Sequence, residues 1–318
     1  MNVVAGTNPS LALALTPTTG TLTGVVTNGA GGPPLDGASV QVQGTTGAAI
    51  TGDGGQFSFL NVPLGPLTLV VSMTGYQTTH VPVTVVAGVN PPLTIALTAT
   101  PSVCAPPPSG LASWWSGEGN TNDVHGSNHG TPQGGLSYGA GKVGQAFVLN
   151  GTDGYFDTPS NGIPAGNAAR TVEMWLKPRA DSVALDQNTA FFYGAVALRR
   201  GFGIDMDGLT GSGNVRLQVF IFFTDINGID TGVKPDTYFH VAATYDGTTL
   251  RAFINGVEKG SFTPGLPLET ATTNLNIGRS FSAAYFGGQL DEVSIYNRAL
   301  QSSELTSIAG AGSAGKCR

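Results

Sequence analysis

Residues 238–260 read YFHVAATYDGTTLRAFINGVEKG, and this stretch decides the fold class. Alternate residues from Val241 to Tyr245 fall on one face of an extended strand, and the residues between them fall on the other. The dipeptides at 246–247 (Asp-Gly) and 255–256 (Asn-Gly) are typical of tight hairpin turns. The stretch therefore predicts a meander of successive antiparallel hairpins.

The composition extends this prediction to the whole chain. Among 318 residues there are 47 Gly and 20 Pro, and only 11% are charged, which favours many short strands joined by turns. A chain of this length predicts two domains, both all-β. The net charge is −6 and the 14 basic residues do not cluster, which argues against a nucleic-acid partner. No apolar run approaches the roughly 20 residues of a spanning helix, so we expect no membrane insertion.

Residues 111–318 resemble the laminin-G-like, concanavalin-type jelly roll. Besides the meander, the resemblance is carried by LASWWSGEGNTNDVHGSNHGT at 111–131, VGQAFVLNGTDGYFDTP at 143–159, RTVEMWLKP at 170–178, LNIGRS at 275–280 and FGGQLDEVSIYNRALQSSEL at 286–305. The order and spacing of these segments match across almost the entire domain. The resemblance implies a jelly roll with its ligand sites on loops.

Residues 18–100 contain alternating strands separated by Gly, Pro and Asp-Gly turns. They resemble the carboxypeptidase regulatory-like domain, a transthyretin-like β-sandwich, through Gly24-Val25-Val26, Leu35–Val40, Thr51–Phe57, Pro63-Leu64-Gly65 and Gly75-Tyr76. Members of that family are noncatalytic spacers and interaction modules. The Pro-rich segment 101–110, PSVCAPPPSG, is predicted to be a short, stiff linker to the jelly roll.

An internal repeat precedes the first domain. Residues 3–16, VVAGTNPSLALALT, recur as VVAGVNPPLTIALT at 85–98. Because the second copy closes the first domain, we expect residues 1–17 to be an orphan strand left from a preceding repeat of a tandem array. The apolar face of that strand must fray, fold back or add to a sheet edge of another molecule, and its members are Leu11, Leu13 and Leu15.

The two cysteines bracket the second domain. A disulfide between Cys104 and Cys317 would hold the two ends of this domain together, and two free thiols are the alternative. Such a bridge persists in an oxidising compartment, which predicts an extracellular or cell-surface protein.

The jelly-roll resemblance also implies a structural calcium ion, and the matching residues are Glu118, Asp123 and Asp291. The loop 117–130 is rich in Gly, Asn, Ser and Asp, so it offers the carbonyl and carboxylate oxygens that calcium prefers. The alternative is that the acidic residues cap turns and accept hydrogen bonds from backbone amides.

Glycan binding on such a fold would use exposed aromatic rings together with polar loop residues. No motif unites the candidates, which are Tyr285, Tyr193, Asp225, Asn227, Asp230 and Arg279.

Catalytic motifs are missing from the sequence. Retaining glucanases of this fold carry E-x-D-x-x-E, and neither this pattern nor G-x-S-x-G or H-E-x-x-H occurs. We therefore predict a noncatalytic extracellular adhesion or carbohydrate-binding protein, with the jelly roll as the head that binds a glycan or a cell-surface protein. The alternative is a structural subunit of an extracellular filament, assembled from copies of itself by strand donation from residues 3–16.

Overall fold

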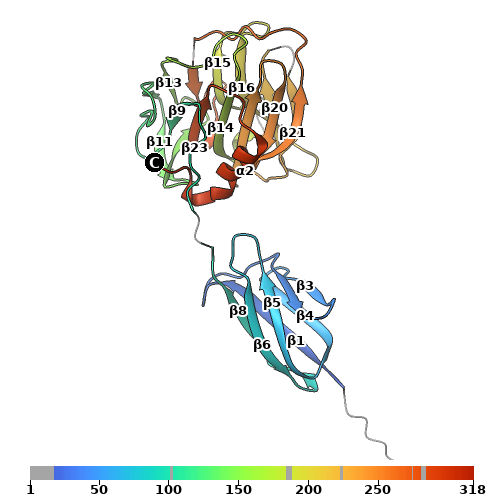
Figure 1. Ribbon diagram of the computed structural model, residues 1–318. Coiled ribbons are helices and arrows are strands. Elements are labelled where there is room, and N and C mark those ends of the chain that lie inside the picture. Colours follow the sequence, from blue (N-terminus) through green and yellow to red (C-terminus); the bar gives the residue numbers. More distant parts are fainter. Residues whose placement is uncertain (1–17, 101–102, 184–187, 223–224, 274, 281–283) are drawn as a thin grey trace, which may run out of the picture. The chain divides into compact units, whose positions relative to one another are not determined.

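The computed structural model describes residues 18–100, 103–183, 188–222, 225–273, 275–280 and 284–318. The chain divides into two compact units, residues 1–101 and 102–318. Strands are the dominant regular structure of both units, which confirms the predicted all-β class (Figure 1). Within the described residues, neither helix is long and apolar enough to cross a membrane.

The first unit is a sandwich of two four-stranded sheets. One sheet contains β1 (Thr19–Asn28), β4 (Gln56–Pro63), β7 (Gly88–Val89) and β8 (Leu93–Leu97), and the other contains β2 (Ser39–Val42), β3 (Ala48–Ile50), β5 (Gly65–Ser72) and β6 (Thr79–Val85). Alternate residues such as Val26, Val40 and Leu69 fill the space between the sheets. Gly24 is required where β1 meets β8, because a Cβ there would lie 2.5 Å from the Leu93 carbonyl oxygen. The predicted sandwich is confirmed.

The repeated sequence at 85–98 includes β7 and β8, which both run parallel to β1. Its first copy, with Leu11, Leu13 and Leu15, lies outside the described residues. Strand donation by this copy therefore stays a prediction.

The second unit is a jelly roll of two larger sheets. The seven-stranded sheet has the order β10 (Thr131–Gln133), β13 (Tyr155–Thr158), β22 (Leu275–Ile277), β15 (Asn188–Gly194), β16 (Gly201–Leu209), β17 (Val215–Phe220), β18 (Ile226–Asp230). The eight-stranded sheet has the order β11 (Ser137–Ala140), β12 (Gln145–Asn150), β23 (Gly287–Tyr296), β14 (Arg170–Pro178), β19 (Phe239–Tyr245), β20 (Leu250–Ile254), β21 (Val257–Phe262), and β9 (Leu111–Trp115) also pairs with β23.

The predicted meander is β19, β20 and β21. Val241, Ala243 and Tyr245 face the core between the sheets, as the alternation predicts. Asn255 has a φ of 50°, the left-handed conformation that an Asn-Gly hairpin turn requires. The meander therefore follows directly from local sequence.

The C-terminal segment covers the outer face of the eight-stranded sheet. The helix α2 (Ser302–Ala311) begins with a capping box at Gln301 and Glu304, and it is followed by the short helix η1 (Gly312–Ala314). The buried Leu305 and Ile308 of α2 belong to an apolar cluster with Phe253 of β20. The remaining helix, α1 (Ala180–Val183), is a single turn after β14.

The predicted disulfide between Cys104 and Cys317 is confirmed, and it closes a loop with a sequence separation of 213. The Ala105 N–H donates to the Gly315 carbonyl, and the Cys317 N–H donates to the Ala105 carbonyl, both at 2.8 Å. The two ends of the second unit are therefore joined by covalent and hydrogen bonds.

Candidate functional site

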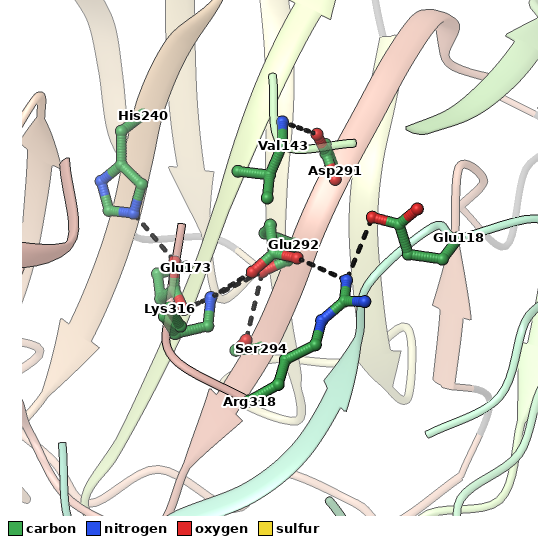
Figure 2. Close-up of polar contacts among 9 residues, drawn as sticks. All are labelled: Glu118, Val143, Glu173, His240, Asp291, Glu292, Ser294, Lys316 and Arg318. Carbon is green, nitrogen blue, oxygen red and sulfur yellow. Dashed lines mark hydrogen bonds and ion pairs between the residues drawn. The ribbon is translucent and has the colours of Figure 1, made fainter. Parts of the chain in front are cut away.

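A buried charge cluster lies beneath the C-terminal segment, on the outer face of the eight-stranded sheet (Figure 2). It consists of Glu173, His240, Glu292 and Lys316, whose side chains are all buried. Lys316 Nζ is 3.0 Å from Glu173 Oε1 and 3.4 Å from Glu292 Oε2. His240 Nε2 is 2.8 Å from Glu173 Oε2.

The neighbouring Lys316 and His240 keep the carboxyl group of Glu173 deprotonated. Burial by itself would raise the pKa of this carboxyl, but Lys316 and His240 outweigh burial and hold the pKa at about 2. Burial raises the pKa of Glu292, and Lys316 opposes that shift. Because these groups are enclosed and paired with one another, the cluster does not face a ligand.

Backbone geometry explains how two glutamates reach one cation. The register between β14 and β23 shifts between Glu173 and Trp175, and Glu292 adopts a φ of 58°. An extra residue in one strand locally re-aims side chains, and a non-glycine residue in this left-handed region is strained. The bulge therefore brings Glu292 to the same Lys316 that pairs with Glu173.

The structure gives Asp123 a different role from the expected calcium ligand. Its Oδ1 accepts hydrogen bonds from the backbone N–H groups of Trp114, His125 and Gly126, and its Oδ2 accepts one from Asn128. Burial would raise the pKa of Asp123, but these amide donors hold it below its usual value. The carboxylate of Asp123 therefore organises the loop, as the alternative of hydrogen bonds from backbone amides predicts, and a calcium-binding role for Asp123 stays untested.

Glu118 and Asp291 lie close enough for the charge of Glu118 to raise the pKa of Asp291. Asp291 Oδ2 accepts a hydrogen bond from the Val143 N–H at 2.8 Å, whereas its buried Oδ1 has no hydrogen-bond partner among the described residues (Figure 2). Burial, with Glu292 and Glu118 contributing, raises the Asp291 pKa to about 7.

A glycine-containing segment runs close to both carboxylates. A Cβ on Gly141 would lie 2.6 Å from Asp291 Oδ2, and one on Gly144 would lie 2.3 Å from Glu118 Oε1. An unpaired buried carboxylate oxygen beside a second carboxylate suits a hard cation. In the parts of the chain with described positions, however, no three His, Cys, Asp or Glu residues converge on a point that could hold a metal ion. Glu118, Asp123 and Asp291 therefore do not form a three-carboxylate site in this part of the chain, and calcium binding stays a prediction.

Tyr193 was expected to bind sugar, and this expectation is wrong. The side chain is fully buried in the core between the sheets. Its hydroxyl accepts a hydrogen bond from Arg170 Nη1 at 2.7 Å and donates one to the Pro164 carbonyl at 3.2 Å. Alternation along β15 places Tyr193 on the inward face with Phe191, so no ligand reaches it.

Three further candidates lie at the β17–β18 side of the seven-stranded sheet. Asp225 accepts hydrogen bonds from the Ile221 N–H and from Gln218. Asp230 accepts hydrogen bonds from Asn214 and the Gly232 N–H, and Asn227 is exposed on β18. β18 is the edge strand opposite β10 and β13, so these residues do not join Tyr285 and Arg279.

Arg279 and Tyr285 come together with two residues that the sequence analysis did not identify, Tyr155 and Asp157. We call these four residues the edge site. Arg279 Cζ lies 4.2 Å from the Tyr155 ring centroid, and the Tyr155 and Tyr285 rings are 5.9 Å apart. All four side chains are partly exposed. Burial raises the pKa of Asp157, and the charge of Arg279 opposes this shift.

The strand β13 positions half of the edge site. Phe156 packs in the core, so its neighbours Tyr155 and Asp157 project from the outer face of the seven-stranded sheet. The alternation in GYFDTP at 154–159 could have identified this pair. Their proximity to Arg279 arises from pairing of β13 with β22, a contact between segments far apart in sequence.

Phenylalanine rings occupy the outer face of β15, β16 and β17. The Phe192 and Phe220 rings stack at 6.0 Å, and Phe222 packs edge-on against both. Gly203 lies beneath them, because a Cβ there would be 2.1 Å from Phe220 Cζ. Phe192 and Phe220 are buried, so the edge site is the more accessible aromatic group on this face.

Comparisons with known proteins identify the same family for each unit as the sequence resemblance predicts. The family model of the carboxypeptidase regulatory-like domain matches residues 21–98, and that of the concanavalin A-like lectin/glucanases superfamily matches residues 150–306. A search of curated proteins found no match.

Among solved structures, domain 4 of AbnA, an extracellular arabinanase from Geobacillus stearothermophilus, is 27% identical, with a TM-score of 0.50; the match covers 63% of this chain and 98% of that one. That structure was solved in complex with arabinotriose. The binding domain of Paraclostridial Mosquitocidal Protein 1 shares the fold at 18% identity and a TM-score of 0.50, over 63% of this chain and 52% of that one. The chain therefore consists of a carboxypeptidase regulatory-like domain followed by a domain of the concanavalin A-like lectin/glucanases superfamily.

Proposed function

We propose that the second unit is a noncatalytic carbohydrate-binding domain that holds an oligosaccharide at the edge site. The observation that carries this proposal is the pairing of two partly exposed tyrosine rings, Tyr155 and Tyr285, with the charges of Arg279 and Asp157. Aromatic rings pack against the apolar faces of sugars, and charged groups hydrogen-bond their hydroxyls. The edge site offers both kinds of contact, from β13 and from the segment that follows β22.

The relation to domain 4 of AbnA supports this proposal. Its match covers nearly all of that domain, and the ligand there is arabinotriose. Arabinotriose is therefore the first probe for this chain. The disulfide, which persists in oxidising compartments, supports an extracellular or cell-surface location.

The composition of the edge site supports a binding role rather than hydrolysis. Retaining glycosidases place two carboxyl groups about 5 Å apart on either side of the scissile bond. The edge site contributes one carboxylate, Asp157. On the same sheet, Asp205 is buried, so it does not line an open cleft.

Isothermal titration calorimetry of the full chain with arabinotriose tests the proposal. Tyr285→Ala removes one ring and Arg279→Gln removes the charge, and each should weaken binding about tenfold or more, since a stacking or charged contact is lost. Asp230→Asn, at the opposite edge, is the matched control and should bind as the wild type does. Equal binding by all four proteins would place the sugar elsewhere, and release of arabinose would replace a binding role with hydrolysis.

A second candidate function is a filament subunit that accepts the repeated strand of another copy. The observation that favours it is the position of β8, which pairs only with β1 among the described strands and presents an edge. Deletion of residues 1–17 should then abolish concentration-dependent assembly followed by light scattering. Assembly that persists after this deletion would contradict strand donation.

A further inference from the structure

A cavity of about 450 Å³ lies within the second unit, beside the disulfide. Its apolar walls include Pro107, Pro108, Leu111 and Val124. This volume falls in the range of small-molecule sites, which are mostly apolar with a few polar groups. The edge-site residues do not line this cavity, so it is a separate place on the unit.

Trp114 lines the cavity and carries an unsatisfied donor. Its Nε1 is buried and has no hydrogen-bond partner among the described residues. Buried donors are nearly always paired, because leaving one without an acceptor costs its full desolvation. A ligand with an oxygen acceptor would supply the missing partner.

The other polar side chains of the cavity add further donors. The Arg318 side chain is 51% exposed, and its Nη2 serves both Glu118, at 3.0 Å, and Glu292, at 3.7 Å. Its guanidinium carries further N–H donors on Nε and Nη1. His125 and Ser109 complete the polar lining, and neither an amide nor a carboxylate side chain contributes to it.

Two backbone carbonyls at the cavity already accept a hydrogen bond each. The Ser109 carbonyl accepts a hydrogen bond from Arg298 Nε at 2.8 Å. The Gly110 carbonyl accepts one from the Asn297 N–H at 2.7 Å. A ligand that mainly accepts hydrogen bonds therefore suits this lining better than one that must also donate.

We propose that this cavity binds a small organic carboxylate with an aromatic or otherwise apolar body. The body packs against the proline, leucine and valine walls. The carboxylate accepts hydrogen bonds from Trp114 Nε1 and the Arg318 guanidinium. An anion supplies the acceptor that Trp114 Nε1 lacks and adds to the two ion pairs of Arg318, and charge-assisted hydrogen bonds of this kind are the stronger ones.

Titration of the full chain with benzoate tests the proposal, and benzyl alcohol serves as the uncharged control of similar size. Benzoate should bind at least tenfold more tightly than benzyl alcohol, since hydrogen bonds to charged groups exceed those to neutral ones. Raising the salt concentration should weaken benzoate binding. Equal affinity for the two compounds, or no binding of benzoate, would overturn the proposal.

Two variants separate the contributions. Trp114→Phe keeps an aromatic ring but removes the N–H, and Arg318→Gln removes the charge of a half-exposed side chain. Each should weaken benzoate binding about fivefold to tenfold. Arg279→Gln at the edge site should leave benzoate binding unchanged, and saturating benzoate should not displace arabinotriose. Wild-type benzoate affinity in the folded Arg318→Gln protein would also contradict the assignment.

Discussion

Lys316 Nζ lies 3.0 Å from Glu173 Oε1, and the two residues are 143 positions apart in the sequence. This buried ion pair joins the end of the chain to β14 in the middle of the eight-stranded sheet. It lies next to the disulfide at Cys317, so a charge interaction and a covalent bond hold the same segment in place.

Lys316→Met should destabilise the second unit by about 3–5 kcal/mol, because it leaves Glu173 and Glu292 buried without their cation. Chemical denaturation followed by tryptophan fluorescence measures the change. Arg318→Met is the matched control: its side chain is 51% exposed, so a much smaller loss is expected. If both variants lost a similar amount of unfolding free energy, burial would not explain the cost of removing Lys316.

Replacing Cys104 and Cys317 with serine should lower the stability of the second unit by as much as about 5 kcal/mol in the chain-entropy model, because the bridge closes a long loop. Differential scanning calorimetry should show this as a lower unfolding midpoint for the second unit. The transition of the first unit, which contains neither cysteine, serves as an internal reference. An unchanged second transition would mean that noncovalent contacts suffice to hold the two ends.

Asp205→Asn should stabilise the second unit at high pH but not at low pH. Burial raises the pKa of Asp205 from 3.8 to about 7, with smaller contributions from Asp225 and Asp207. Between these pH values the folded chain keeps a proton that the unfolded chain has released, so Asp205 costs stability as the pH rises from about 4 to about 7. Asparagine resembles the protonated acid and removes that cost.

The gain from Asp205→Asn should be near zero at pH 4 and should level off above pH 7 at a value on the order of 2–4 kcal/mol. Urea denaturation across this pH range measures it. Asp207→Asn, two residues along β16 and half-exposed, should show no comparable rise. A gain that is independent of pH would contradict a raised Asp205 pKa.

Calcium should raise the unfolding midpoint of the second unit, and Asp291→Asn should abolish that rise, because Asp291 has an unpaired buried oxygen close to Glu118. Differential scanning fluorimetry with calcium and with a chelator measures the effect. Asp123→Asn should lower the midpoint under both conditions and keep the calcium response. If Asp123→Asn abolished the calcium response and Asp291→Asn did not, Asp123 would be a calcium ligand and Asp291 would not.

Local sequence was sufficient to predict much of the fold. Hairpins depend on residues that are neighbours in the chain, so the alternation from Val241 to Tyr245 and the turn at Asn255 could be read without a structure. The disulfide was also predictable, since Cys104 and Cys317 are the two cysteines of the sequence and they bracket one domain.

The site was less predictable, because alternation tells which residues share a face but not which face is inward. Phe191 and Tyr193 share a face of β15, and only packing against the other sheet makes that face the core. Likewise, Tyr155 meets Arg279 because β13 pairs with β22, across more than 100 positions of sequence.

The sequence by itself determined the two all-β domains, their families and the pairing of the cysteines, because turn dipeptides, alternation and motif order are properties of the linear chain. Tertiary structure alone decided the charge state of Glu173, the raised pKa of Asp205 and the capping role of Asp123. These properties depend on burial and on distances between charges, and both are set by segments that meet only after folding.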